Sequence, residues 1–186
     1  MKFAIKYDIN TAIKKIIQDN LDELMIPYSV SGISEITLLK DISNEQLDTL
    51  IKHFAEYGIE IVTNQKTALV QRIKDAIIEA IYSDDGMPNV TFSVYLADKL
   101  NHSYSYLSNL FSEQCYTSIE NFIIIHKIER AKQLLISEEL TLTQISYQLN
   151  YSSVAHLSNQ FKKTTGLTPS TFQRIIRKRS EQEVLG

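Results

Sequence analysis

The fold of the second half of the chain is decided by the stretch Ile145-Ser-Tyr-Gln-Leu-Asn-Tyr-Ser-Ser-Val-Ala-His-Leu-Ser-Asn-Gln-Phe161, because an earlier stretch repeats its plan. Leu107-Ser-Asn-Leu-Phe111 nearly duplicates Leu157-Ser-Asn-Gln-Phe161, which lies fifty residues later. Leu96–Asn101 resembles Ile145–Asn150 in the same way. Self-similarity at a fixed separation indicates a repeated supersecondary unit. We therefore expect two copies of one structural unit.

Each copy predicts two short helices joined by a tight turn. The first helix ends at Asn101 or Asn150, and asparagine tolerates left-handed backbone angles. Polar residues follow, among which Ser103 in one copy and Ser152 or Ser153 in the other can cap the second helix. The second helix buries a few apolar residues and has a small, polar outer face. This pattern is typical of a helix-turn-helix.

A long helix is predicted between the two copies. Thr117-Ser-Ile-Glu120 has the pattern of a capping box, and apolar residues continue at helical spacing to Ser137. From Ile119 to Ser137 such a helix spans about 28 Å at 1.5 Å per residue. One turn of B-DNA is about 34 Å. A rigid spacer of this length can hold two recognition helices in successive major grooves.

Residues 88–179 resemble the DNA-binding domain of the AraC/XylS family of bacterial transcription regulators. The resemblance is carried by the repeat, by the linker segment His126–Leu135 and by the ending with Gly166 and Thr168-Pro169. It implies an all-α domain and an activator that binds double-stranded DNA and contacts RNA polymerase. Family members often carry glycine where this chain has Tyr116 and Asn150, so we expect an irregular end to the first recognition helix at Tyr116.

By the pattern of the family, eight side chains face the bases. Asn109 and Asn159 can each bond an adenine edge through two hydrogen bonds, and His156 can donate to guanine. The alternatives are an exposed helix surface without a task for the asparagines, and a capping or packing role for the histidine. The predicted base contacts are Ser105, Ser108, Asn109, Val154, Ala155, His156, Ser158 and Asn159.

Phosphate contacts are expected mainly from the second copy. Lysines follow its recognition helix, a last helix carries arginine, and three hydroxyl side chains lie near helix N-termini, which attract phosphate. The first recognition helix has no Lys or Arg, which weakens its expected contribution to affinity. The predicted phosphate contacts are Ser152, Ser153, Lys162, Lys163, Thr168 and Arg174.

Charge divides the chain unevenly. Residues 1–86 contain 9 Lys and Arg against 14 Asp and Glu, whereas residues 87–186 contain 10 against 8. Between Asn150 and Ser180 there are six basic residues and no acidic one. An acidic front and a basic back indicate two modules, one of which binds a polyanion.

Residues 1–64 are predicted to form a small α+β domain with a ferredoxin-like β-α-β-α-β order. The strands are expected from alternation or β-branched content, and the helices from apolar spacing and from the capping box Ser43-Asn-Glu-Gln46 with Gly58 as stop. The predicted strands are 2–7, 28–39 and 59–62, and the predicted helices are 11–25 and 43–57. Its expected roles are dimerisation, effector sensing or protein contact.

Residues 65–88 are predicted to be a connecting helix and linker, 89–180 the tandem helix-turn-helix domain, and 181–186 a tail. The connecting helix has Leu69, Ile73, Ile77 and Ile81 in line. This stripe can pack on its own sheet or on the next domain, or it can form a dimer seam, which the spacing slightly favours. A homodimer is therefore expected through the N-terminal half or residues 65–82.

Composition argues against several other classes of protein. A single cysteine, Cys115, permits no intrachain disulfide, and we find no signal peptide and no apolar run long enough for a membrane span. We expect a cytoplasmic protein. No phosphate loop, zinc spacing or nucleophile motif is present, so we expect neither an enzyme nor a bound cofactor or metal. The alternative function is a helix-turn-helix fold that binds another protein and modulates another regulator.

Overall fold

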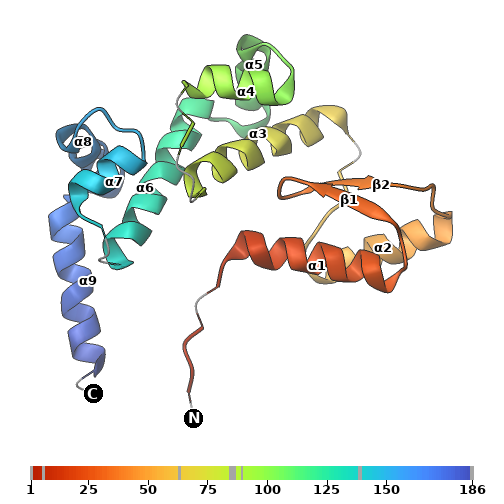
Figure 1. The fold of residues 1–186 in the computed structure, drawn as a ribbon, viewed down its shortest axis with the longest axis horizontal. Helices are drawn as coiled ribbons and strands as arrows, with labels where there is room; N and C mark the ends of the chain where they lie inside the picture. Colours follow the sequence, from red (N-terminus) through yellow and green to blue (C-terminus); the bar gives the residue numbers. More distant parts are fainter. Residues whose placement is uncertain are drawn as a thin grey trace. The chain divides into compact units, whose positions relative to one another are not determined.

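The computed structural model describes residues 2–5, 7–62, 64–83, 87–88, 90–137 and 140–184, with side chains as far as Lys178. The chain divides into two compact parts, here called the N-terminal body (Met1–Ala76) and the C-terminal body (Ile77–Gly186). The division falls within helix α3 (Gln65–Tyr82). Each body is described by itself (Figure 1).

The N-terminal body contains two helices and a β-hairpin before α3. Its elements are α1 (Ile9–Glu23), β1 (Tyr28–Ser31), β2 (Glu35–Leu38) and α2 (Asn44–Glu56). The predicted capping box at the start of α2 is confirmed, because the hydroxyl of Ser43 accepts from Gln46 N–H and the Gln46 side chain accepts from Ser43 N–H. Gly58 follows the end of this helix with a left-handed φ of 70°, as predicted.

The hairpin contributes one face to the core of this body. β1 and β2 pair antiparallel with Tyr28 opposite Leu38 and Val30 opposite Ile36. Exposure alternates along both strands, and the inner side chains pack on a cluster from α1, α2 and the segment between α1 and β1. Figure 1 shows the hairpin beside α1 and α2. The cluster consists of Ile17, Leu21, Ile26, Leu50 and Phe54.

The prediction of a ferredoxin-like β-α-β-α-β domain in residues 1–64 is wrong. The described residues form only the two-stranded sheet β1–β2. Residues 2–5 and Tyr7 belong to no strand, and Phe3 and Ile5 are 77% and 83% exposed. Alternating apolar residues favour a strand only where the side chains on one face of the segment are buried against other residues. In this segment the side chains on both faces are exposed.

The predicted strand 59–62 is also absent, because its first residue belongs to the end of α2. Ile59 N–H donates to the Phe54 carbonyl at 2.9 Å, and Gly58 N–H donates to Ala55 at 3.0 Å. These bonds form a Schellman cap around the left-handed glycine. Ile59 and Ile61 still pack against the core cluster, so their apolar character is explained without a strand.

The first part of α3 is tied to the hairpin turn. The carboxylate of Asp75 accepts from the Ser34 hydroxyl and from Gln71 Nε2, the latter at 2.8 Å. Arg72 and Glu35 form an ion pair at 3.3 Å. The apolar stripe along α3 is buried within a single chain, which supports packing inside the chain over a dimer seam in this helix. The stripe residues are Leu69, Ile73, Ile77 and Ile81.

The described part of the C-terminal body beyond α3 is helical, as predicted. Its helices are α4 (Phe92–Leu100), α5 (Tyr104–Cys115), α6 (Ile119–Ser137), α7 (Leu142–Gln148), α8 (Val154–Thr165) and α9 (Pro169–Val184). α4–α5 and α7–α8 are the two helix-turn-helix units, and Figure 1 shows α6 running from one unit to the other. The left-handed angles predicted at the two asparagines are confirmed, with φ of 54° at Asn101 and 53° at Asn150.

Candidate nucleic-acid interface

The second helix-turn-helix presents α8 with one buried and one open face. Ser153 caps the helix, because its hydroxyl accepts a hydrogen bond from His156 N–H at 3.1 Å. Leu157 and Phe161 are fully buried at a spacing of four residues and anchor the helix to its neighbours. The side chains on the other side of α8 are left for contacts outside the chain.

The first helix-turn-helix repeats this construction in α5. Both helices have 12 residues, and each position in α5 lies fifty residues before its counterpart in α8. Ser103 caps α5 by accepting from Tyr106 N–H at 3.3 Å, and Leu107 and Phe111 are fully buried. The local rules that make α8 a two-faced helix therefore make α5 one as well.

The two recognition helices also end in the same way. Tyr116 adopts left-handed angles with φ of 54°, and its N–H donates to the Ser112 carbonyl at 3.1 Å. Gly166 has φ of 78° and donates to the Lys162 carbonyl at 2.8 Å. The irregular end expected at Tyr116 is not found, because the tyrosine adopts the conformation that the family usually assigns to glycine.

On its buried side, each recognition helix packs through an aromatic pair against the helix that follows it. The rings of Phe111 in α5 and Phe122 in α6 lie edge to face with centroids 5.4 Å apart. Phe161 in α8 and Phe172 in α9 lie 5.6 Å apart in the same arrangement. Such pairs prefer this geometry, so each recognition helix is held at a defined angle to the helix that follows it.

The predicted base-contact side chains lie on the outer sides of α5 and α8. In α5 they are spaced like Ser105 and Asn109, four residues apart, and share one side of the helix, whereas the five positions in α8 cover a broader arc that runs from Val154 to His156. Five of the eight are exposed, namely Ser105, Asn109, Ala155, His156 and Asn159. Three are half-buried, namely Ser108, Val154 and Ser158.

Three of the predicted residues meet in the first turn of α8. The hydroxyl of Ser152 lies 3.0 Å from His156 Nδ1, and Ser153 caps the same turn. The His156 ring also packs edge to face against Tyr151 with centroids 5.1 Å apart. His156 is thus oriented by its neighbours while its side chain stays exposed.

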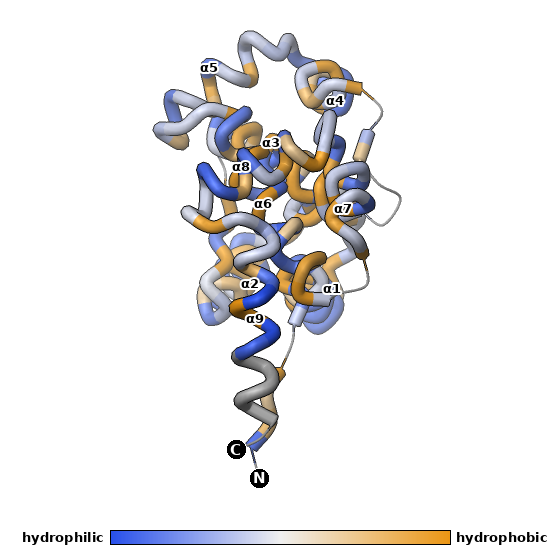
Figure 2. The backbone as a smooth tube through the Cα atoms, turned by 90° about the vertical axis from the view of Figure 1, so that its left-hand side faces the viewer, coloured by the Kyte–Doolittle hydropathy of each residue, from blue (hydrophilic) through white to orange (hydrophobic). Residues whose placement is uncertain are grey.

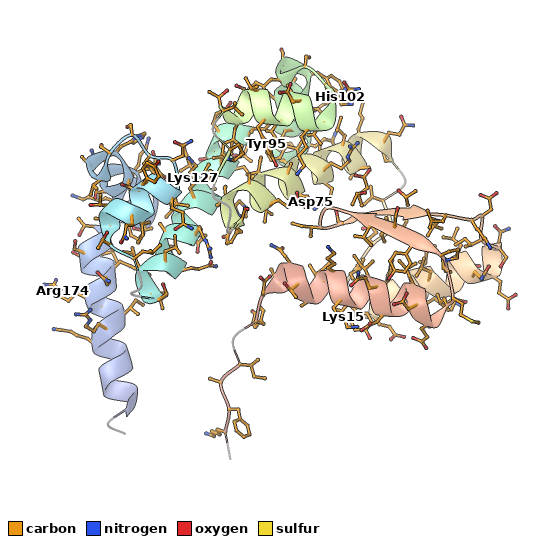
Figure 3. All side chains as sticks on the ribbon, viewed as in Figure 1. Lys15, Asp75, Tyr95, His102, Lys127 and Arg174 are labelled. Carbon is orange, nitrogen blue, oxygen red and sulfur yellow. The ribbon has the colours of Figure 1, made fainter. Side chains whose placement is uncertain are left out.

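The basic residues gather at the second unit. Lys162 and Lys163 are exposed in the last turn of α8, whereas the equivalent positions of α5 are Ser112 and Glu113. Arg174 is exposed on α9 (Figure 3), and hydrophilic stretches alternate with hydrophobic ones along the coloured part of that helix (Figure 2). Exposed cationic side chains are therefore present in the last turn of α8 and lacking at the corresponding turn of α5.

Thr168 lies apart from the other predicted residues, at the start of α9. Its hydroxyl accepts from Thr171 N–H at 3.2 Å, so it acts as the cap of that helix. Ser118 has the same role at the start of α6, where it accepts from Asn121 N–H at 3.1 Å. The sequence pattern had suggested Thr117 as this cap, one residue too early.

Tyr106 is a further candidate contact residue that the sequence analysis does not identify. Tyr106 occupies the position in α5 that His156 occupies in α8, and it is exposed. Its ring packs against His102 with centroids 5.3 Å apart, much as His156 packs against Tyr151. The separation of fifty residues between the copies was the signal that could have identified it.

A carboxylate is also held near the first unit. The Tyr104 hydroxyl donates to Glu120 Oε1 at 2.5 Å, which links the first turns of α5 and α6. This bond, together with a backbone hydrogen bond, lowers the pKa of the Glu120 carboxyl. Burial and the same bond raise the pKa of Tyr104. Glu120 therefore stays ionised beside α5, a helix that has Glu113 and no Lys or Arg.

Other kinds of site were also sought in the described residues. No group of three or more His, Cys, Asp or Glu side chains among them is placed to hold a metal ion. No helix within the described ranges has both the length and the apolar character required to span a bilayer.

Comparisons with known proteins agree with this geometry. A helix-turn-helix domain model matches residues 96–175. The Msm operon regulatory protein of Streptococcus mutans is 27% identical over 147 residues, which cover 79% of this chain and 50% of that protein. The Xylose operon regulatory protein of Escherichia coli (strain K12) is 32% identical over 78 residues, 42% of this chain and 20% of that protein.

A solved structure extends the comparison to three dimensions. The C-terminal domain of AraT, a response regulator from Geobacillus stearothermophilus, has a TM-score of 0.51 and 26% identity, and the match covers 60% of this chain and 88% of that one. The chain spans half or less of the length of the two regulatory proteins named above. In residues 96–175, this chain is therefore similar to the helix-turn-helix domain of bacterial regulatory proteins.

Proposed function

We propose that the protein is a sequence-specific, DNA-binding transcription regulator that inserts α5 and α8 into successive major grooves of one duplex. The observation that carries this proposal is the equivalence of the two helices in length, caps, buried anchors and outer faces. α6 has 19 residues, about 28 Å at 1.5 Å per residue, which suits the 34 Å or so between successive major grooves.

The eight base-facing side chains and six phosphate-facing side chains named from the sequence remain our assignment of the contacts. Exposed asparagine and histidine side chains on α5 and α8 supply hydrogen-bonding groups for base edges. Lysine side chains beside α8 supply charge for phosphate. In this assignment the second unit provides most of the affinity, and both units provide specificity.

The finer parts of the proposal come from the family. We assign the protein as an activator that contacts RNA polymerase and works in the cytoplasm, where its DNA is located. Residues 89–180 act as the DNA-binding domain, 65–88 as connecting helix and linker, and 181–186 as a tail, while 1–64 sense an effector or bind protein. A promoter-reporter assay with and without the chain tests the sign of regulation.

A homodimer is proposed through the N-terminal body. The stripe on α3 is already buried, whereas α2 has Leu47 and Ile51 exposed at 36% and 44%. These side chains line an open groove of about 500 Å³ together with Ala55, Gly58 and Ile61. Sedimentation equilibrium of the chain and of its Ile51→Lys variant tests this contact: a monomeric wild-type chain would contradict it.

The alternative function is a helix-turn-helix fold that binds another protein. It is favoured by one observation, the absence of Lys and Arg from α5 together with Glu113 in its last turn. The two functions differ in salt dependence, because neutralising phosphates releases counterions and a mainly apolar protein contact does not.

The proposed function is tested by selection from a pool of random duplex DNA with the purified chain. We expect enrichment of two short blocks whose centres are about one helical turn, 10–10.5 bp, apart. Binding to the enriched duplex should weaken steeply as salt rises. No enrichment at low salt, or a flat salt dependence, would favour the protein-interaction alternative.

A further inference from the structure

One lysine of the linker helix contacts an aromatic ring in each helix-turn-helix. Lys127 Nζ lies 5.9 Å from the ring centroid of Phe92, the first residue of α4. It also lies 5.1 Å from the ring centroid of Tyr151, which precedes α8 in the second unit. Figure 3 labels Lys127 on α6, between the two units. A single side chain therefore touches both halves of the DNA-binding domain.

The side chain of Lys127 is half-buried, and its ammonium group lies over the rings of Phe92 and Tyr151. Burial lowers the pKa of Lys127 to about 8. Two other lysines of this body have a carboxylate partner: Lys99 pairs with Glu79 at 2.7 Å, and Lys132 pairs with Glu129 at 2.5 Å. A cation that lies over ring faces and away from water is attracted to them more strongly than at an exposed site.

The two units depend on α6 for their relative position. α4 packs on α5, and α5 packs on α6, whereas α7 and α8 pack on each other and on α6. α6 has buried apolar side chains along its length, for example Ile123 towards one end and Leu135 towards the other. Lys127 adds a contact of another kind, because its cation lies over one ring from each unit.

We propose that Lys127 is a positioning residue that fixes the angle between the two helix-turn-helix units and thereby the spacing of the two DNA blocks that the protein accepts. The fixed angle follows from the geometry alone, whereas the effect on the spacing of the DNA blocks rests on the proposed function. Separate experiments test the angle and the spacing.

The angle is tested by pulsed electron paramagnetic resonance on the full chain. Spin labels at the exposed positions Ser112 and Thr164, in a Cys115→Ser background, report the distance between α5 and α8. Lys127→Arg keeps a cation and should keep the distance distribution narrow. Lys127→Met is similar in length but neutral, and we expect the distribution to broaden or shift. An unchanged distribution in Lys127→Met would overturn the proposal.

A second pair of variants tests the same contact from the side of the ring, so that the conclusion does not depend on Lys127→Met alone. Tyr151→Phe keeps the ring, and the distance distribution should not change. Tyr151→Leu removes the ring and should broaden the distribution as Lys127→Met does. If Lys127→Met fails to fold, this pair decides: equal distributions in Tyr151→Phe and Tyr151→Leu would refute a role for the shared cation.

The spacing is tested on the selected duplex with one or two base pairs inserted between its blocks. The wild-type chain and Lys127→Arg should lose binding at least tenfold on insertion of two base pairs. Lys127→Met should lose it less than threefold. Equal discrimination by all three proteins would reject the link to spacing. If no duplex is ever selected, the proposed function fails, while the distance measurement still decides the role of Lys127.

Discussion

Tyr116 illustrates how a single residue can carry strain without disturbing the helix that it ends. It has left-handed angles, with φ of 54° and ψ of 26°, and its side chain is 95% exposed. A side chain in this conformation costs about 1–2 kcal/mol, because Cβ approaches the following carbonyl oxygen. Gly166 has the same role in the second unit without that cost. The first recognition helix therefore ends at a strained residue.

Tyr116→Gly should stabilise the protein. The substitution relieves the left-handed strain and loses almost no packing, while glycine costs about 0.5–1 kcal/mol of backbone entropy. We expect a net gain of about 0.5–1 kcal/mol in the free energy of unfolding, measured by chemical denaturation. Asn101→Gly is the matched control at φ of 54° and should gain less, because asparagine tolerates this region. Equal gains in the two variants would argue against strain at Tyr116.

At the scale of elements, the two recognition helices share a construction but differ in charge. Lys162 and Lys163 occupy the last turn of α8, and Ser112 and Glu113 occupy the same turn of α5. Cations in the last turn also stabilise a helix through its dipole, whereas a carboxylate there does the opposite. The repeat thus gives both units the same construction, whereas the residues in the last turn give a positive charge to α8 and a negative charge to α5.

Replacing Lys162 and Lys163 by glutamine should remove two phosphate contacts. DNA binding should therefore become weaker and its affinity less dependent on salt. Each lost phosphate contact lowers the slope of log K against log salt by about 0.9, so we expect a decrease of about 1.8. The measurement is a salt titration of affinity for the selected duplex.

Two further variants make this prediction specific. Lys52→Gln with Lys66→Gln removes the same charge from the N-terminal body and should leave the slope unchanged. The reciprocal change, Ser112→Lys with Glu113→Lys, should steepen the slope and tighten binding. A slope that responds equally to both glutamine pairs would mean that long-range charge, not contact by α8, sets the salt dependence.

The linker helix α6 should make the stability of the protein depend on pH. Burial lowers the pKa of His126, whose ring packs on Phe122 with centroids 4.3 Å apart. The unfolded chain takes up a proton near pH 6.5 that the folded chain binds more weakly. The unfolded state therefore binds more protons below that pH, and the free energy of unfolding falls as pH decreases from about 6.5.

His126→Gln isolates this contribution. Glutamine does not titrate, so the variant should lose less free energy of unfolding between pH 7.0 and 5.5 than the wild-type chain does. The difference between the two slopes is at most about 1.36 kcal/mol per pH unit, the value for one proton. Parallel slopes would show that the proton affinity of His126 is the same in both states.

At the scale of the whole molecule, the sequence predicted the two bodies unequally well. In the C-terminal body the repeat, the capping serines and the terminal asparagines are local signals that agree with one another, so its helix order was predicted correctly. The cation of Lys127 between Phe92 and Tyr151 was not predicted, since it joins residues far apart in the chain.

The N-terminal body lacks such redundant signals. Phe3 and Ile5 alternate as in a strand, and Ile59 begins an apolar run, but neither segment has a ladder partner among the described residues. Tertiary context decides strand formation more than propensity does. The ferredoxin-like prediction failed because it took alternation and β-branched content as sufficient.

The central claim is that α5 and α8 each recognise one block of a bipartite DNA site. It is tested most directly by repeating the selection from random duplex DNA with Asn109→Ala and with Asn159→Ala. Both side chains are exposed at equivalent positions, so neither variant should unfold the chain. We predict that each variant relaxes one block only, and that the two variants relax different blocks, at a cost of about 1–3 kcal/mol per lost base contact. If both variants enrich the wild-type site unchanged, or if a single block is enriched throughout, the claim of two base-recognising helices is contradicted.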